Sequence, residues 1–193
     1  KRRLAYSTVS QVSYIVLGIA VGGLLATSGG MVHLVHQGLM KITLFFCAGI
    51  FGLLLGVSKI DQLDGLGRRM PWVSVAFTVA ALGMIGLPPI VGFISKWYLA
   101  SGALAVGMPA VLAVVITSAL LNAAYFLPLV GRLWLGPPGS VAAARIEIGR
   151  LPRLALVCSA LATAFLTVAL GLMAAHPLSP LNWVIKIAEG YAP

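Results

Sequence analysis

One apolar stretch, from Pro71 to Ala105, limits the possible folds of this chain more than any other part of it. It contains a single charge, Lys96, and a straight helix of its roughly 35 residues would be about 50 Å long. The hydrocarbon core of a bilayer is only about 30 Å thick. Because 60% of the whole sequence is hydrophobic and only 9% is charged, we expect an integral membrane protein rather than a soluble domain.

The sequence predicts that this stretch is a discontinuous helix, interrupted at Gly86–Pro89. Pro88 and Pro89 lack the N–H groups that the carbonyls of Met84 and Ile85 would accept in an unbroken helix. Backbone acceptors left open at membrane depth must be buried in protein or face water. Secondary transporters build ion sites at such breaks, and a lysine two turns beyond the break fits that arrangement. A simple proline kink, with a lysine that extends toward the membrane surface, is the alternative.

The other apolar segments bring the prediction to five transmembrane helices in an all-α membrane fold. A turn at Ser28–Gly30 is predicted between the first two spans, and no soluble domain is apparent. The predicted spans are 4–27, 31–56, 71–105, 109–131 and 154–174, which form one membrane domain over residues 1–175, and an amphipathic tail covers 176–193.

The basic residues predict how the chain is oriented in the membrane. The turns at 27–30 and 105–109 contain no lysine or arginine, so the basic loops alternate with uncharged turns. Under the positive-inside rule, the N-terminus of this chain is cytoplasmic and the protein is a multi-pass protein of the inner cell membrane. The net charge of +9 is therefore a sign of topology in a lipid bilayer and not of a nucleic-acid partner. Ten of the 13 basic residues lie in three loops: Lys1, Arg2, Arg3, Lys59, Arg68, Arg69, Arg132, Arg145, Arg150 and Arg153.

The second predicted span carries an ionisable side chain near its middle. Lys41 lies about 15 Å into that span. His33 and Gln37 precede it at intervals of four residues, so all three share one helix face, and His36 lies one residue off that face. Charges at mid-membrane cost at least about 2.5 kcal/mol and commonly mark an ion or proton path. The alternatives are a rigid polar core that holds Lys41 on backbone carbonyls, and an interfacial role for the two histidines.

Other polar residues of the spans are weaker candidates. Gln11 belongs to an unusually polar start of the first span, compatible with a hydrated half-channel or with contacts between helices. Asn122 is a candidate for a hydrogen bond across helices. Cys47 and Cys158 lie in apolar runs and are expected to act as small hydrophobes. Because no nucleotide-binding, metal-binding or nucleophile motif is present, we expect no catalytic residue, metal or cofactor in this chain.

Four motifs resemble one family of membrane subunits. In chain order they are KRRLAYSTVSQVSY, HLVHQGLMKITLFFCAG, LDGLGRRMPW and MIGLPPIVGFISKWYL. Their order and spacing resemble the second half of the proton-conducting, antiporter-like subunits of Mrp-type cation/proton antiporters, of respiratory complex I and of membrane-bound hydrogenases. The letters of KITLFFCAG and GRRMPW are most similar to the D subunit of Mrp antiporters. The resemblance covers about residues 1–135 well.

The resemblance implies a fold and a set of site residues. The family is built from two inverted repeats of five helices, and this chain resembles the second half of that transporter fold, as a fragment of a longer protein. Lys96 matches the family's lysine on the second discontinuous helix, and Lys41 matches the central lysine of the preceding helix. His33 matches the first histidine of an HxxxHxxxK pattern. Lys1 matches a lysine that contributes to the proton path in relatives.

One position departs from the family pattern. Gln37 stands where many relatives have the second histidine. An amide can relay through bound water but cannot itself hold a proton. The resemblance therefore leaves two alternatives, in which either His36 substitutes or water carries this step.

The sequence leads to two functions and one bland alternative. The first is proton translocation between Lys41 and Lys96 within a multisubunit Na⁺/H⁺-type antiporter, with H⁺ and Na⁺ or K⁺ as ions and other membrane subunits as partners. The alternative is the membrane arm of a redox-driven proton pump, either a complex I-like NADH:quinone oxidoreductase or a membrane-bound hydrogenase. Whether the parent complex is an enzyme therefore stays open. The bland alternative is a scaffold in which both lysines are dispensable.

Overall fold

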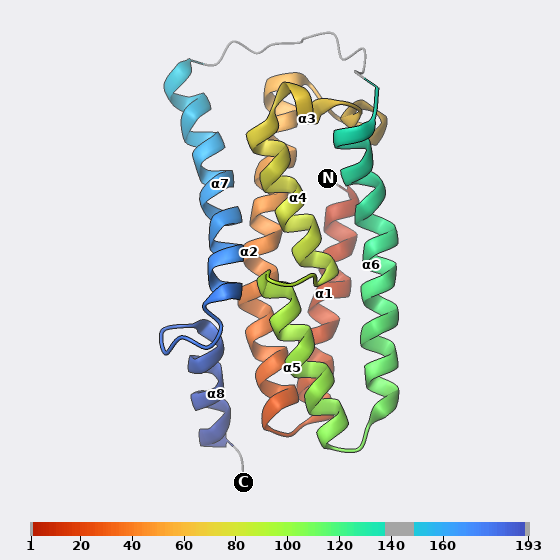
Figure 1. Cartoon of the computed structure of the whole chain (residues 1–193), viewed down its shortest axis with the longest axis vertical. Helices are drawn as coiled ribbons and strands as arrows, with labels where there is room; N and C mark the ends of the chain where they lie inside the picture. The colour runs from red at the N-terminus through yellow and green to blue at the C-terminus, as the bar shows by residue number, and fades with distance from the viewer. Residues whose placement is uncertain (1, 138–148, 192–193) are drawn as a thin grey trace.

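A computed structural model of the chain describes residues 2–137 and 149–191, and it is helical with no strand among them (Figure 1). The loop predicted after residue 136 lies mostly outside the described residues, as does Lys1. The elements are α1 (Arg2–Val21), α2 (Leu24–Leu55), η1 (Ile60–Leu63), α3 (Leu66–Arg69), α4 (Pro71–Ile85), α5 (Val91–Ala105), α6 (Pro109–Leu135), α7 (Arg150–Leu172) and α8 (Pro180–Tyr191).

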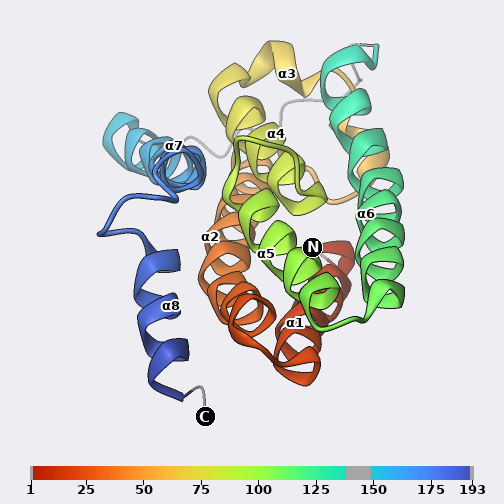
Figure 2. The ribbon, with the colours of Figure 1, turned by 60° about the horizontal axis from the view of Figure 1, so that its bottom comes forward.

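Helix α2 is the centre of the bundle. It has 32 residues and is about 48 Å long. It contacts α1, α4, α5, α7 and α8, while α6 packs against α4 and α5 on the other side (Figure 1). A view turned by 60° shows α7 and α8 outside the group formed by α1, α2 and α5 (Figure 2). Side chains that point from α2 into this group are therefore enclosed by neighbouring helices.

The membrane architecture predicted from the sequence is confirmed. Four helical segments within the described residues are long and apolar enough to cross a bilayer: Leu4–Val21, Leu24–Leu55, Pro109–Leu135 and Arg150–Leu172. The helices α4 and α5 have 15 residues each, so each is only about 22 Å long. They follow one another along the bundle and together form the discontinuous span (Figure 1).

The helix break has the position that the prolines predict. Helix α4 ends at Ile85, and Gly86 follows in the left-handed conformation with a φ of 99°. Lys96 returns from α5 to this end, and its Nζ donates hydrogen bonds to the carbonyls of Met84 at 2.8 Å and Ile85 at 2.9 Å. These are the two carbonyls that Pro88 leaves open together with its neighbour. The lysine amine therefore replaces the missing backbone donors.

The predicted turn at Ser28–Gly30 is wrong. The chain reverses at Gly22 and Gly23, whose φ values of 74° and 72° suit glycine, and Ser28–Gly30 lies inside α2. The predicted start of the second span at residue 31 is therefore seven residues too late. The shift leaves Lys41 about 25 Å from the start of α2 and about 21 Å from its end, which is again the middle of the helix.

Close helix packing explains why these small residues are not a turn. The backbone of Gly30 touches Gly18 of α1, so a Cβ atom at either position would collide with the other helix. Gly29 faces the backbone of α5 near Ser95 in the same way. Small residues allow membrane helices to approach closely. The Ser-Gly-Gly segment is thus a packing surface between α2 and two neighbours.

The two ends of the bundle differ in charge. The segments η1 and α3, with the basic residues of the loop, lie at the same end as the C-terminal end of α6, and the short turns before α2 and after α5 lie at the opposite end (Figure 1). Arg132 pairs with Asp61 at 2.6 Å and lies 3.8 Å from Asp64. Its carbonyl also accepts a hydrogen bond from the backbone N–H of Gly65. These contacts connect the loop to α6.

The predicted amphipathic tail contains the helix α8. Leu181 and Ala188 are buried and lie seven residues apart, on one helix face. Trp183, Lys186 and Ile187 are exposed. Because α8 contacts α2, the tail packs on the bundle and is part of its fold.

We expect the substitution Lys96→Met to destabilise the protein. Methionine fills similar space but donates no hydrogen bond, so the carbonyls of Met84 and Ile85 are left buried and unsatisfied. The expected loss is roughly 1–3 kcal/mol in the free energy of unfolding, measured as thermal unfolding of the full-length protein in detergent. The control is Lys186→Met on the exposed face of α8. Equal stability of the two variants would contradict the assigned role of the amine.

The close approach of α5 and α2 makes a second prediction. A Cβ atom on Gly102 would collide with the backbone of Ala26, whereas nothing lies within 4 Å of one on Gly49. We expect Gly102→Ala to lower the free energy of unfolding by about 1–3 kcal/mol. Gly49→Ala is the matched control and is expected to leave stability unchanged or raised, because alanine favours helix. The same unfolding assay compares the two variants, and a Gly102 variant as stable as its control refutes the packing argument.

Candidate functional site

The polar side chains inside the bundle follow one face of α2. His33, Gln37 and Lys41 are all buried, with exposed fractions of 1%, 7% and 5%. Lys96 on α5 is equally buried, at 5%. Since charged and polar groups are costly inside a membrane, their burial needs partners for their hydrogen bonds.

Lys41 is held by the first turns of α1. Its Nζ donates to the carbonyl of Leu4 at 3.0 Å and to Oγ of Ser7. Oγ of Ser7 in turn donates to the same carbonyl at 2.9 Å. Two of the three N–H donors of the ammonium thus have partners among the described residues, and one donor is left for another acceptor.

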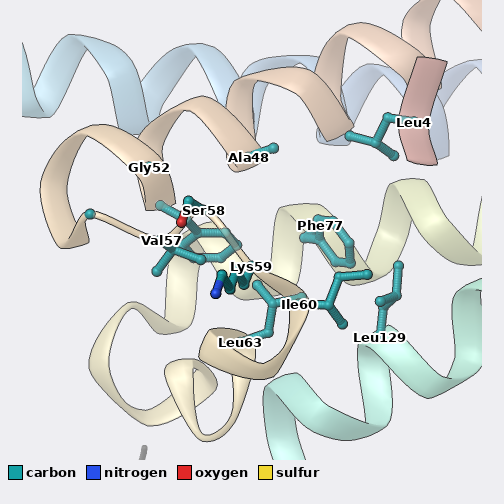
Figure 3. Close-up of a pocket in the computed structure, with 12 residues that line it drawn as sticks. Leu4, Ala48, Gly52, Val57, Ser58, Lys59, Ile60, Leu63, Phe77 and Leu129 are labelled. Carbon is teal, nitrogen blue, oxygen red and sulfur yellow. The ribbon is translucent and has the colours of Figure 1, made fainter. Parts of the chain in front are cut away.

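A cavity of about 460 Å³ lies beside this contact, between α2 and η1 (Figure 3). Leu4 stands at one end of it, and Ser58 and Lys59 lie toward the other (Figure 3). Leu4 therefore forms part of the cavity wall while its carbonyl binds Lys41. The remaining lining residues are mostly apolar: Ala48, Phe51, Gly52, Gly56, Val57, Ile60, Leu63, Phe77 and Leu129.

His33 is the centre of a hydrogen-bond network across four helices. Its Nδ1 lies 2.7 Å from Oγ of Ser95 on α5, and its Nε2 lies 3.0 Å from Oε1 of Gln11 on α1. Nε2 of Gln11 donates to Oδ1 of Asn122 on α6 at 3.3 Å. Nδ2 of Asn122 donates to the carbonyl of Ser118 at 2.8 Å. The network connects α5, α2, α1 and α6 in the membrane interior.

Lys96 reaches the same region through an aromatic ring. Its Nζ lies 5.1 Å from the ring centre of Tyr14, within the range of a cation–π contact. The ring of Tyr14 lies 5.2 Å from the ring of His33. Ser95 is the neighbour of Lys96 in the chain and binds His33 directly. Lys96 and His33 therefore belong to one site, with Ser95 and Tyr14 between them.

His36 lies outside this network. It is buried, and its Nδ1 has no hydrogen-bond partner within the described part of the chain. It faces the backbone of Val91 at the start of α5. The sequence alternative in which His36 takes the place of the family's second histidine thus meets a side chain directed to the helix break and not along the face of Gln37.

A gap separates the two lysine sites. His33 and Lys41 are eight residues apart on α2, which corresponds to about 12 Å along the helix. Gln37 is the residue between them on that face, and its amide does not titrate. Any proton that moves along this face needs water between the two sites.

Two of the network residues were weakly signalled by the sequence, and one was missed. Gln11 and Asn122 are amides within apolar spans, which is the signal that made them secondary candidates. Ser95 was not singled out, because a serine in a membrane helix is common and its contact with His33 depends on how α5 packs against α2. No group of three His, Cys, Asp or Glu that could hold a metal ion is found in residues 2–137 and 149–191.

Comparison with known proteins agrees with the resemblance in the motifs. The family described as "NADH:quinone oxidoreductase/Mrp antiporter, TM" matches residues 1–121. The chain is 46% identical over 134 residues to NADH-quinone oxidoreductase subunit N of Desulforudis audaxviator, which is 69% of this chain and 27% of that protein. It is 34% identical over 99 residues to the D subunit of the Na⁺/H⁺ antiporter of Alkalihalophilus pseudofirmus, which is 51% of this chain and 20% of that protein.

A solved structure has the same fold. The structure of the Mrp complex from Dietzia sp. DQ12-45-1b matches with a TM-score of 0.83 and 28% identity, over 97% of this chain and 42% of the matched chain. This chain thus spans less than half the length of the proteins it matches. The resemblance predicted from the four motifs is confirmed, and the chain belongs to the NADH:quinone oxidoreductase/Mrp antiporter transmembrane family.

Proposed function

We propose that this chain is the part of a proton-translocating membrane subunit in which protons pass between Lys41 and Lys96. One observation carries the proposal. Lys96 is buried at the helix break, held by the carbonyls of Met84 and Ile85, and its chain neighbour Ser95 binds His33. An intramembrane lysine at a broken helix is a functional arrangement in transporters.

The two carbonyls suit a lysine that gains and loses a proton. A neutral amine keeps two N–H donors and a lone pair, whereas an ammonium has three donors. Both forms can therefore donate to Met84 and Ile85 without a change of rotamer. The carbonyls also lie at the C-terminal end of α4, where the helix dipole favours a cation. The break thus stabilises the ammonium and still accommodates the neutral amine.

The interior between the lysines needs both His33 and water. His33 exchanges protons close to neutral pH in ordinary surroundings and lies next to the Lys96 site. The remaining distance to Lys41 is about 12 Å and contains the amide of Gln37. Water ordered by this amide carries the proton across that distance. Lys41 then connects to the cavity beside Leu4 and to the end of the bundle that bears Lys59.

The proposed partners are other membrane subunits of the same complex, and the leading energy source is a cation gradient. The match to the Mrp complex structure over nearly the whole chain supports an antiporter that moves H⁺ against Na⁺ or K⁺. The 46% identity to subunit N of an NADH-quinone oxidoreductase supports the second candidate, a redox-driven proton pump. The basic end of the bundle favours a cytoplasmic location for that end in the inner membrane.

Replacement of either lysine in the full assembly tests the transport role. We expect Lys41→Ala and Lys96→Ala to lower the rate of proton movement in vesicles by about 10²-fold or more. The variant Lys96→Arg is sharper, because arginine keeps donors and charge but does not release its proton. It should assemble and remain inactive, while Lys186→Ala transports normally. An assembled Lys96→Arg complex with the wild-type rate would refute the proposal.

The composition of the purified complex tests the energy source. We expect the full-length protein to co-purify with small hydrophobic subunits and without iron, as measured by intact mass and metal analysis. Subunits that carry iron–sulfur clusters would replace the antiporter with the redox-driven pump, and the roles proposed for Lys41 and Lys96 would stay the same. A full-length protein that purifies alone and still moves protons would contradict both assemblies.

A further inference from the structure

The network around His33 has a direction that its backbone anchor determines. A carbonyl oxygen can only accept hydrogen bonds, so the group of Asn122 that faces the Ser118 carbonyl at 2.8 Å must be its NH₂. The carbonyl oxygen of the Asn122 side chain therefore faces Gln11. That oxygen again can only accept.

The same reasoning fixes the orientation of Gln11. Its NH₂ must face Oδ1 of Asn122, at 3.3 Å, and its Oε1 must face His33. Oε1 carries no hydrogen and lies 3.0 Å from Nε2 of His33. The hydrogen of this bond therefore belongs to the imidazole.

The two ring nitrogens of His33 then have different roles. A neutral imidazole has one N–H, and the partner of one nitrogen determines the state of the other. With the hydrogen on Nε2, Nδ1 is an acceptor. The hydroxyl of Ser95, at 2.7 Å, must donate to it.

We propose that Gln11 and Asn122 are positioning residues that hold His33 in the Nε2–H tautomer, so that His33 gains and loses its exchangeable proton only at Nδ1, on the side of Ser95 and Lys96. Burial supports this role, since Gln11, His33 and Ser95 are at most 1% exposed and Asn122 is 7% exposed. Water therefore does not replace the amide partners. The consequence for transport rests on the proposed function, whereas the tautomer does not.

Ser95 has a second acceptor that makes room for the extra proton. Its Oγ lies 3.4 Å from the carbonyl of Gly92. When Nδ1 binds a proton, the imidazolium donates to Oγ of Ser95, and the hydroxyl hydrogen turns to Gly92. Loss of the proton from Nδ1 restores the first arrangement. No proton crosses the ring from Nε2 to Nδ1, so His33 is a reversible proton acceptor beside Lys96 and does not conduct through its imidazole.

The tautomer can be measured directly by ¹⁵N NMR on the full assembly, with ¹⁵N-labelled histidine and a His33→Gln variant for assignment. We expect a protonated Nε2 and an unprotonated Nδ1 for neutral His33. The variant Gln11→Leu removes the acceptor and should shift the tautomer ratio by roughly tenfold toward Nδ1–H. The matched control is Gln37→Leu, which removes a buried amide from α2 outside the network and should leave the tautomer of His33 unchanged.

Two results would overturn the proposal. One is an Nδ1–H tautomer in the wild-type assembly, which requires no variant to fold. The other is a Gln11→Leu assembly in which Nε2–H stays fully populated. Both readouts are independent of transport, so inactive or fully active lysine variants affect the proposed function alone. If the tautomer behaves as expected but the lysine variants transport normally, His33 is held as described and the proton path lies elsewhere.

Discussion

The hydrogen bonds from Lys96 to Met84 and Ile85 are the interaction on which the rest of this structure depends. Each half of the discontinuous span is about 22 Å long and too short to cross the membrane alone. The break between them exposes carbonyls at a depth where no lipid group can bind them. The lysine binds both carbonyls from the second half-helix and so connects the two halves. The fold and the proposed proton site therefore use one amine.

Space for this amine is created by glycine. Gly86 has a φ of 99°, and a Cβ atom there would approach Cδ of Lys96 to 3.0 Å, so both the backbone and the lysine stem exclude a side chain. The contact between α4 and α5 across the break also depends on glycine, since a Cβ atom on Gly92 would collide with the carbonyl of Gly83. Close packing keeps the polar atoms near each other and away from lipid. The same packing brings Ser95 to His33.

The parts of the fold that follow from local chemistry were predictable from the sequence. Missing N–H groups of two prolines determine where the helix breaks and which carbonyls are open, and hydropathy determines the spans. The turn was not predictable, because Ser28–Gly30 has the same composition in a turn as in a packing surface, and only the position of the neighbouring helices decides. The contact of Ser95 with His33 was unpredictable for the same reason. Buried amides such as Gln11 were detectable, but their partners were not.

The two lysines are held in different ways, and this difference has a consequence for the path between them. Lys96 binds the end of a half-helix inside the bundle, while Lys41 binds the first turns of α1 beside a cavity. Gln37 lies between them and offers both a donor and an acceptor to water without binding a proton. A titratable group at that position would hold a charge between two cations. An amide avoids that repulsion, so a proton that leaves one lysine meets no competing site before it reaches the other.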